Sequence, residues 1–166
     1  FLSCREKGYS EKIALELWRQ IESFAGYAFN KAHSASFALV SFQVAYLKSH
    51  YPAEFMASVL SNRGGYYSAA VYIQESKRMG LQILLPDVNQ SKYEYFGDKN
   101  FIRIGFMAIK KFSHNSMETI ANERKENGRY VSLPDFLIRT RLAYEETALL
   151  IKCGAMDCFE ETRPTL

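Results

Sequence analysis

Apolar residues return at helical spacing near the start of the chain. Within residues 10–25, side chains three or four positions apart share one face of a helix. The residues on that face are Ile13, Leu17, Ile21 and Phe24. Gly26 follows at a position where helices commonly end. The pattern predicts an amphipathic helix over residues 10–25.

A second stretch, residues 35–49, is apolar on nearly every side. A helix without a polar face is typical of a protein interior. At about 15 residues, the stretch is shorter than the roughly 20 that a membrane helix needs. We therefore expect a central core helix here, followed by another helix that opens at Pro52 and runs to Leu60.

Loop signals divide the middle of the chain. Residues 62–65 form a predicted loop, and Ser68 can cap a helix that ends before Gly80. Residues 86–89 then break the pattern with a proline and polar residues. This break is the candidate domain boundary.

The second half alternates short strands and helices. Two strand-like runs, residues 92–96 and 101–104, are separated by a Gly-Asp-Lys-Asn loop, which predicts a β-hairpin. Asn115 opens a predicted capping box, Ser132 begins a short helix, and residues 145–152 form the last helix. The helices suggest two helix–turn–helix units with faint similarity in sequence. The pattern therefore predicts a mainly α fold with a small β-hairpin.

Composition is that of an ordinary globular protein, with 48% hydrophobic and 23% charged residues. No apolar run approaches the roughly 20 residues of a membrane helix, so no membrane partner is expected. Cys4, Cys153 and Cys158 have no metal-site spacing and indicate reduced thiols in a cytoplasmic protein. The chain opens at Phe1 without an initiator Met or a leader, which predicts a piece of a longer chain.

The net charge of +3 permits binding to polyanions without requiring it. The local arrangement at Asn30-Lys31-Ala32-His33-Ser34 is more informative, because it directly precedes the apolar helix. Ser34 can cap that helix, and the helix N-terminus together with Lys31 and His33 suits a phosphate. Asn30 can hydrogen-bond a sugar or a base edge. A capped helix with a solvated lysine is the structural alternative.

Lys110, Lys111 and His114 form a second basic cluster, between the second strand and the helix that follows it. Such a turn can present cations and backbone amides to a DNA phosphate, and a solvated basic loop is the alternative. Tyr66 and Tyr67, in a glycine-flanked loop, are the aromatic residues best placed to stack on nucleobases. Most other aromatic residues are expected in the core.

The sequence contains no recognisable catalytic centre. Two-metal phosphoryl transfer needs paired carboxylates, and none of the four aspartates has Asp-x-Asp spacing. The phosphate-binding Gly-x-x-x-x-Gly-Lys loop, His-Glu-x-x-His and Gly-x-Ser-x-Gly are all missing from the sequence. We therefore expect no catalytic residue, no metal ligand and no bound cofactor in this chain.

Residues 24–34, 37–43 and 47–56 closely resemble the fingers region of the bacterial DNA polymerase III alpha subunit, a C-family polymerase. The resemblance continues in short blocks over nearly the whole chain. These blocks are residues 78–80, 85–89, 104–110 and 151–157. The spacing around residues 64–68 resembles the shorter, error-prone alpha-like branch.

The resemblance implies a distal fingers region in residues 1–88 and a tandem helix-hairpin-helix DNA-binding domain in residues 89–166. The parent would be a DNA-directed DNA polymerase of replication or translesion synthesis. Its partners would be primer–template DNA, deoxynucleoside triphosphates, a sliding clamp and other replisome subunits. Its Mg²⁺ would be held by aspartates of an upstream palm domain, so the chain alone is expected to be inactive.

The resemblance also assigns roles to the two basic clusters. Asn30, Lys31, His33 and Ser34 would face the nascent base pair and the incoming nucleotide. The cluster of Lys110, Lys111 and His114 would contact the DNA duplex.

Two positions depart from the family pattern. Family hairpins usually carry Gly-hydrophobic-Gly after an Ile-Lys pair, where this chain has Lys111-Phe112-Ser113. Glycine lets a backbone approach a phosphate closely. Tyr144-Glu145 stands where the family often has an arginine pair. These departures leave two alternatives open: a non-enzymatic helix-hairpin-helix DNA-binding module, or a structural or protein-interaction domain with degenerate hairpins.

Overall fold

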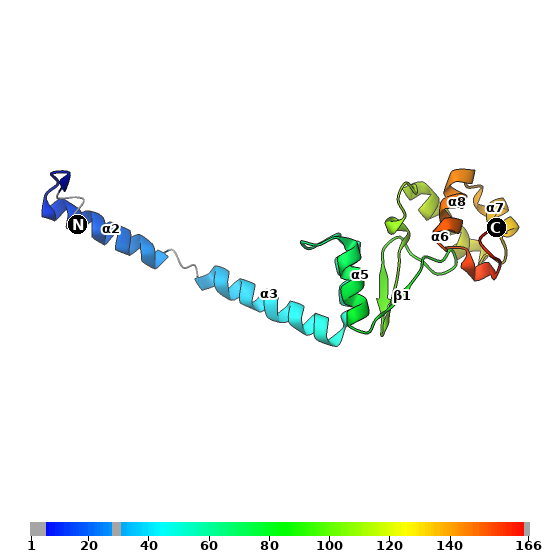
Figure 1. The fold of residues 1–166 in the computed structure, drawn as a ribbon, viewed down its shortest axis with the longest axis horizontal. Coiled ribbons are helices and arrows are strands. Elements are labelled where there is room, and N and C mark those ends of the chain that lie inside the picture. Colours follow the sequence, from blue (N-terminus) through cyan, green and yellow to red (C-terminus); the bar gives the residue numbers. More distant parts are fainter. Residues whose placement is uncertain (1–5, 28–30, 165–166) are drawn as a thin grey trace. The chain divides into compact units, whose positions relative to one another are not determined.

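The computed structural model describes residues 6–27 and 31–164. The chain divides into two compact units, residues 1–45 and 46–166, and Figure 1 colours their elements in sequence order. Helices dominate, and a small three-stranded sheet lies in the second unit. The predicted fold class, mainly α with a small β element, is confirmed.

α2 (Glu11–Tyr27) is the amphipathic helix that the spacing predicts. The Ser10 hydroxyl accepts a hydrogen bond from the Ile13 N–H at 3.4 Å and so caps the helix. Gly26 does not end the helix, which continues to Tyr27. Ala14 is buried, whereas three residues of the predicted stripe are exposed: Ile13, Leu17 and Ile21. Phe24 lies outside the described side chains.

α3 (Lys31–His50) contains the apolar stretch, and its helical structure is confirmed. None of its side chains is buried, and Phe37 and Phe42 are 61% and 76% exposed. The prediction of a core helix is therefore wrong for this chain, because an apolar helix becomes interior only where other segments cover it. The prediction of Ser34 as N-cap is also wrong, because the helix starts at Lys31 and Ser34 is one of its helical residues.

The sheet of the second unit has the order β1-β3-β2. β2 (Phe96–Asp98) and β3 (Phe101–Arg103) are antiparallel and form a hairpin, as predicted. The bounds of its first strand were predicted wrongly, because Gly97 and Asp98 of the predicted loop pair with β3 and only Phe96 of the predicted strand 92–96 belongs to β2. β1 (Gln82–Leu84) runs parallel to β3 and was not predicted. Three residues are too few to show a strand period, and this strand is defined by its pairing with β3.

Two helices pack beside this sheet and form its core. α4 (Pro52–Ser61) begins with its proline in the first turn, as predicted, and α5 (Ala69–Arg78) begins after Ser68. A Cβ on Gly97 of β2 would collide with the backbone carbonyl of Ala53, so glycine permits the close approach of α4. The core residues are Ala53, Met56, Ala57, Leu60, Leu81 and Ile102.

A second core lies among the C-terminal helices, which gather together in Figure 1. They are the short 3₁₀ helix η1 (Phe106–Ala108), α6 (His114–Asn127), α7 (Leu133–Thr140), α8 (Tyr144–Lys152) and the 3₁₀ helix η2 (Asp157–Phe159). Among the residues that fill this core are Val88, Phe106, Ile120, Phe136, Leu150 and Met156.

The predicted break at residues 86–89 is part of this second core. Val88 is fully buried, and its N–H donates to the Ala155 carbonyl at 2.8 Å. Asn89 exchanges two hydrogen bonds with the Tyr130 backbone, at 2.7 and 2.9 Å. The Arg124 guanidinium donates to the Val88 carbonyl at 2.8 Å. The segment is thus anchored to the C-terminal helices, and a functional division at residue 88 stays a prediction.

Candidate nucleic-acid interface

The C-terminal helices form two helix–turn–helix units. In the first, η1 leads through a turn to α6, and in the second α7 leads through a turn to α8. Each turn contains a cation with left-handed backbone, Lys111 with φ 61° and Arg141 with φ 50°. In corresponding positions further along, Ile120 of α6 and Leu150 of α8 are both fully buried. The two units thus share a left-handed cation in the turn and a fully buried apolar residue at the same distance after it.

Lys111 occupies a position where the family pattern has glycine. The left-handed region favours glycine because other residues crowd their own backbone there. Lys111 adopts this conformation without glycine and keeps its side chain exposed. The turn thus retains the backbone shape of a glycine turn while adding a cation.

Ser113 is the N-cap of α6. Its hydroxyl accepts a hydrogen bond from the Ser116 N–H at 3.1 Å. The predicted capping box at Asn115 is wrong, because Asn115 is already inside the first turn of α6. The helix starts earlier since a second group also satisfies its N-terminus.

That second group is the carboxylate of Glu146 on α8. Its Oε1 accepts from the Ser113 N–H at 3.2 Å, and its Oε2 accepts from the Ser116 hydroxyl at 2.7 Å. Burial alone would raise the pKa of Glu146, but the hydrogen bonds from Ser116 and Ser113 outweigh burial and leave the pKa lowered. A carboxylate at a helix N-terminus is stabilised by the helix dipole. The second helix–turn–helix unit thus supplies an anion to the first helix–turn–helix unit.

Glu145 is one of the two residues that stand in place of the arginine pair, and it is exposed. The carboxylate that accepts from the Ser113 N–H belongs to its neighbour, Glu146. Sequence reasoning missed Glu146 because the contact joins two helices, and no local pattern marks it.

Arg139 joins α6 and α7. Its guanidinium donates to Glu123 Oε1 at 3.0 Å and to the Gly128 carbonyl at 2.9 Å. The same group lies over the ring of Tyr130, with 4.3 Å between the guanidinium carbon and the ring centroid. Burial raises the pKa of Tyr130 to about 12, and its hydroxyl donates to the Ile120 carbonyl at 2.9 Å. Arg139 therefore has a structural role at the centre of the two units.

The three residues predicted to contact DNA lie together. Lys110, Lys111 and His114 line a surface depression of about 520 Å³, which we call the hairpin hollow. His114 lies 3.6 Å from the Glu118 carboxylate and packs its ring against Tyr93, with 5.0 Å between centroids. Arg63, from the loop after α4, lines the same hollow and was not singled out from the sequence.

The other predicted site lies at the start of α3. Lys31 and His33 are exposed helical residues, Ser34 is half-buried, and Asn30 lies outside the described residues. The His33 ring meets the Phe37 ring edge-on, with 4.5 Å between centroids. Lys31 and His33 are therefore both at the surface, and their predicted role stays a prediction.

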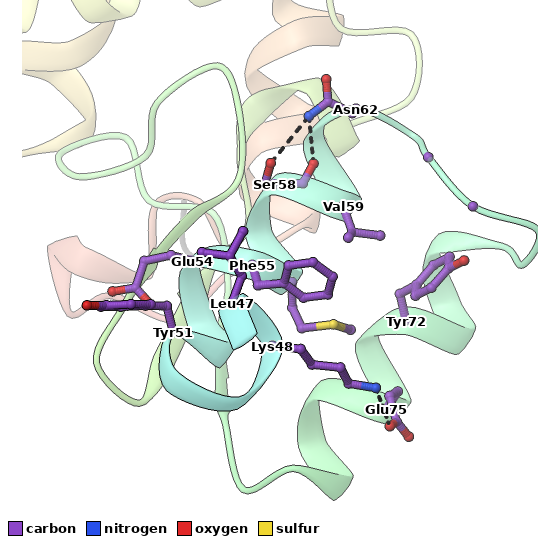
Figure 2. Close-up of a pocket in the computed structure, with 13 residues that line it drawn as sticks. Leu47, Lys48, Tyr51, Glu54, Phe55, Ser58, Val59, Asn62, Tyr72 and Glu75 are labelled. Carbon is purple, nitrogen blue, oxygen red and sulfur yellow. Dashed lines mark hydrogen bonds and ion pairs between the residues drawn. The ribbon is translucent and has the colours of Figure 1, made fainter. Parts of the chain in front are cut away.

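The pocket in Figure 2 lies between the end of α3, α4 and α5, with a volume of about 710 Å³. Phe55, Val59 and Tyr72 give it an apolar lining. At its rim, the Lys48 ammonium lies 3.6 Å from Glu75 (Figure 2). A hydrogen bond from Arg78 is the main reason that the pKa of Glu75 is lowered to about 2. Lys48 and Glu75 are therefore already paired with each other, whereas Glu54, which also lines the pocket, is exposed.

The described residues contain no cluster of metal-ligating side chains. No set of three or more His, Cys, Asp or Glu side chains within residues 6–27 and 31–164 could hold a metal ion. In the same part of the chain, no helix has the length and apolar character needed to cross a membrane.

The two described cysteines, Cys153 and Cys158, are free thiols. Burial raises the pKa of both thiols, to about 11 for Cys158. Because the thiolate is the reactive form, neither is suited to act as a nucleophile.

The helix-hairpin-helix motif family matches residues 80–166, which contain both helix–turn–helix units. The chain therefore belongs to the helix-hairpin-helix family. Over nearly its whole length it is also similar to bacterial DNA polymerase III alpha subunits, and the resemblance predicted from the sequence is confirmed.

The DNA polymerase III subunit alpha of Saccharopolyspora erythraea is 41% identical over 166 residues, which cover 98% of this chain. That of Buchnera aphidicola subsp. Schizaphis graminum is 38% identical over 165 residues, or 96% of this chain. That of Thermus aquaticus is 39% identical over 159 residues, or 93% of this chain. The chain spans only 13–14% of the length of these curated relatives.

Proposed function

We propose that this chain is part of a DNA-directed DNA polymerase and holds DNA through its two helix-hairpin-helix turns. The observation that carries the proposal is the pair of exposed, left-handed cations, Lys111 and Arg141, at equivalent points of the two turns. Similarity to DNA polymerase III alpha subunits along the chain supports it. Two equivalent cations suit two phosphates of a duplex, because phosphate contacts position a protein on DNA.

In the parent polymerase, residues 1–88 would form the distal fingers and residues 89–166 the duplex-binding domain. Asn30, Lys31, His33 and Ser34 would contact the incoming nucleotide and the template during replication or translesion synthesis. Primer–template DNA and deoxynucleoside triphosphates are the proposed substrates, and a sliding clamp and other replisome subunits the proposed partners.

Catalysis by the parent would use Mg²⁺ ions held by an upstream palm domain. This chain would bind and orient the DNA and would add no nucleotide by itself. The resemblance to a replicative polymerase also supports a cytoplasmic location.

The test of DNA holding is the salt dependence of binding by the full 166-residue chain to a blunt DNA duplex. A double variant, Lys111→Gly with Arg141→Gly, removes both cations at positions where glycine is the easiest residue for the backbone. Each lost phosphate contact is expected to reduce the slope of log K against log salt by about 1, so the double variant should lose about 2.

Lys99→Gly is the matched control, because Lys99 is also an exposed lysine with left-handed backbone, φ 50°, but lies in the β2–β3 turn. Its salt slope should equal that of the unmodified chain. An unchanged slope in the double variant, with duplex binding intact, would refute the role of the two turns.

A second candidate function is a structural or protein-interaction domain. The observation in its favour is the Glu146 carboxylate, which occupies the N–H of Ser113 in the first turn. This candidate predicts that the unmodified chain shows no salt-dependent binding to duplex DNA.

A further inference from the structure

A second surface depression lies next to the hairpin hollow, within residues 46–166. A depression of about 320 Å³, which we call the tyrosine hollow, lies between α4, α5 and η1. Arg63 and Met107 line both hollows. The two depressions are therefore adjacent, with the Arg63 side chain at their junction.

The tyrosine hollow has an aromatic wall. Tyr67, Tyr72 and Tyr95 line it. The rings of Tyr67 and Tyr72 lie 6.2 Å apart, and Tyr66 meets Tyr67 edge-on at 5.3 Å. Tyr67 is 61% exposed and Tyr66 is 93% exposed. Exposed aromatic rings are stacking platforms for unpaired bases, because every base has a π face.

The loop between α4 and α5 is held in place beside this wall. Arg63 has left-handed backbone with φ 49°, and Gly65 has φ 91°. A Cβ on Gly65 would collide with the Tyr72 hydroxyl, so glycine lets the loop lie directly on that ring. The loop therefore presents Arg63 and Tyr67 from a defined backbone.

Charge in the two hollows has one sign. Among the described residues, no Asp or Glu lines either depression, whereas Arg63, Lys110 and Lys111 do. Arg63 is close enough to Tyr95 to oppose the effect of burial, which raises the pKa of the Tyr95 hydroxyl. An anion would thus meet three cations without a competing carboxylate in the lining.

The tyrosine hollow has room for a small planar ligand, with a volume of about 320 Å³. A base within a duplex is already stacked and paired, so it cannot enter such a depression without being extruded. An unpaired nucleotide can.

We propose that the two hollows together bind single-stranded DNA, with a base stacked on Tyr67 and its neighbouring phosphates held by Arg63 and the hairpin lysines. This inference rests on the proposed DNA-holding function and assigns a site of its own to an unpaired strand next to the bound duplex. It adds Arg63 and Tyr67 to Lys110 and Lys111 as binding residues.

The experiment compares three fluorescent probes on the full chain: a blunt duplex, the same duplex with a short single-stranded thymidine overhang, and the thymidine strand alone. Tyr67→Leu removes the π face and keeps an apolar side chain. It should weaken binding of the overhang and of the single strand about tenfold and leave the blunt duplex within twofold. Tyr9→Leu is the control, because Tyr9 is an exposed tyrosine of the other unit.

Arg63→Gly tests the cation at the junction. Its backbone is left-handed, so glycine fits the loop, and Lys99→Gly remains the matched control. Arg63→Gly should reduce the salt slope for the overhang by about 1, whereas Lys99→Gly should not change it.

A second readout separates stacking from folding. A 2-aminopurine base in the overhang should change its fluorescence on binding to the unmodified chain, and Tyr67→Leu should abolish that change. If the blunt duplex binds and the overhang adds no affinity, the inference is wrong while the proposed function stands. If no probe binds at low salt, both are wrong. Equal weakening of blunt and overhang probes by Tyr67→Leu would also contradict the inference.

Discussion

Lys111 and Arg141 combine a side-chain cation with a backbone conformation that usually belongs to glycine. A non-glycine residue in the left-handed region is less stable by roughly 1–2 kcal/mol. Both turns carry this strain and both keep the charge exposed. At the scale of the residue, a lysine where the resemblance predicts glycine at position 111 therefore adds a charge to the turn and keeps its backbone shape.

The same scale explains the role of Glu146. Its lowered pKa means that the native state holds the ionised form more tightly than the unfolded chain does. The resulting stabilisation is fully present above the unfolded pKa of about 4.3 and is lost as pH falls through the lower folded value.

Glu146→Gln should lower the free energy of unfolding at pH 7 by about 1–2 kcal/mol, because hydrogen bonds to a charged group are lost. The difference from the unmodified chain should shrink as pH falls below about 4, where the glutamate is itself protonated. Urea unfolding across pH 2.5–7 would measure this, at roughly 1 kcal/mol resolution. Glu145→Gln, an exposed neighbour on the same helix, is the control, and an equal loss in both variants would contradict the capping role.

At the scale of the element, each helix–turn–helix unit is incomplete by itself. α8 supplies the carboxylate at the start of α6, and Arg139 of α7 binds the end of α6 at Gly128. The segment before β2 is tied in as well, through Asn89 and Val88. The two helix–turn–helix units should therefore unfold together.

Asn89→Ala tests this connection. The change leaves both the N–H and the carbonyl of Tyr130 without their partner, and each unsatisfied buried group costs about 1–3 kcal/mol. We expect a loss of at least about 2 kcal/mol in the free energy of unfolding, measured by denaturant titration. The exposed Asn115 of α6 supplies the control: Asn115→Ala should change stability by less than about 0.5 kcal/mol. A single cooperative transition in the unmodified chain is part of the expectation.

At the scale of the whole molecule, the two compact units differ in how they bury apolar surface. The second unit has two cores, whereas α3 exposes apolar side chains along its length. The curated relatives are about seven times longer than this chain, which spans 13–14% of them. Any role of the first unit in nucleotide binding therefore has to be tested in the proposed parent polymerase.

Lys31→Gln in that parent is the decisive change, because it removes the charge of an exposed lysine and keeps much of its length. If Lys31 holds a nucleotide phosphate, KM for the nucleotide should rise about tenfold, since charge-assisted hydrogen bonds are worth roughly 1.5–3 kcal/mol. Steady-state primer extension would measure it. Lys12→Gln, at an exposed lysine of α2, should leave KM unchanged, and so would Lys31→Gln if the lysine is merely solvated.

Local pattern was sufficient for most elements of this protein. Helical spacing predicted α2, an apolar run predicted α3, the proline at residue 52 predicted the start of α4, and Ser132 predicted that of α7. The β2–β3 hairpin followed from its loop composition. These features depend on neighbours in the chain, so the sequence by itself determined them.

Tertiary structure decided the rest, because it depends on groups that are distant in the sequence. β1 exists through its pairing with β3, and α6 starts at His114 since Ser113 and Glu146 cap it together. The apolar pattern of α3 predicted that other segments would bury this helix, but burial depends on segments that the local pattern does not specify, and α3 has no buried residue. Arg63 and the hairpin lysines likewise line one depression although they are distant in the sequence, which no local pattern encodes.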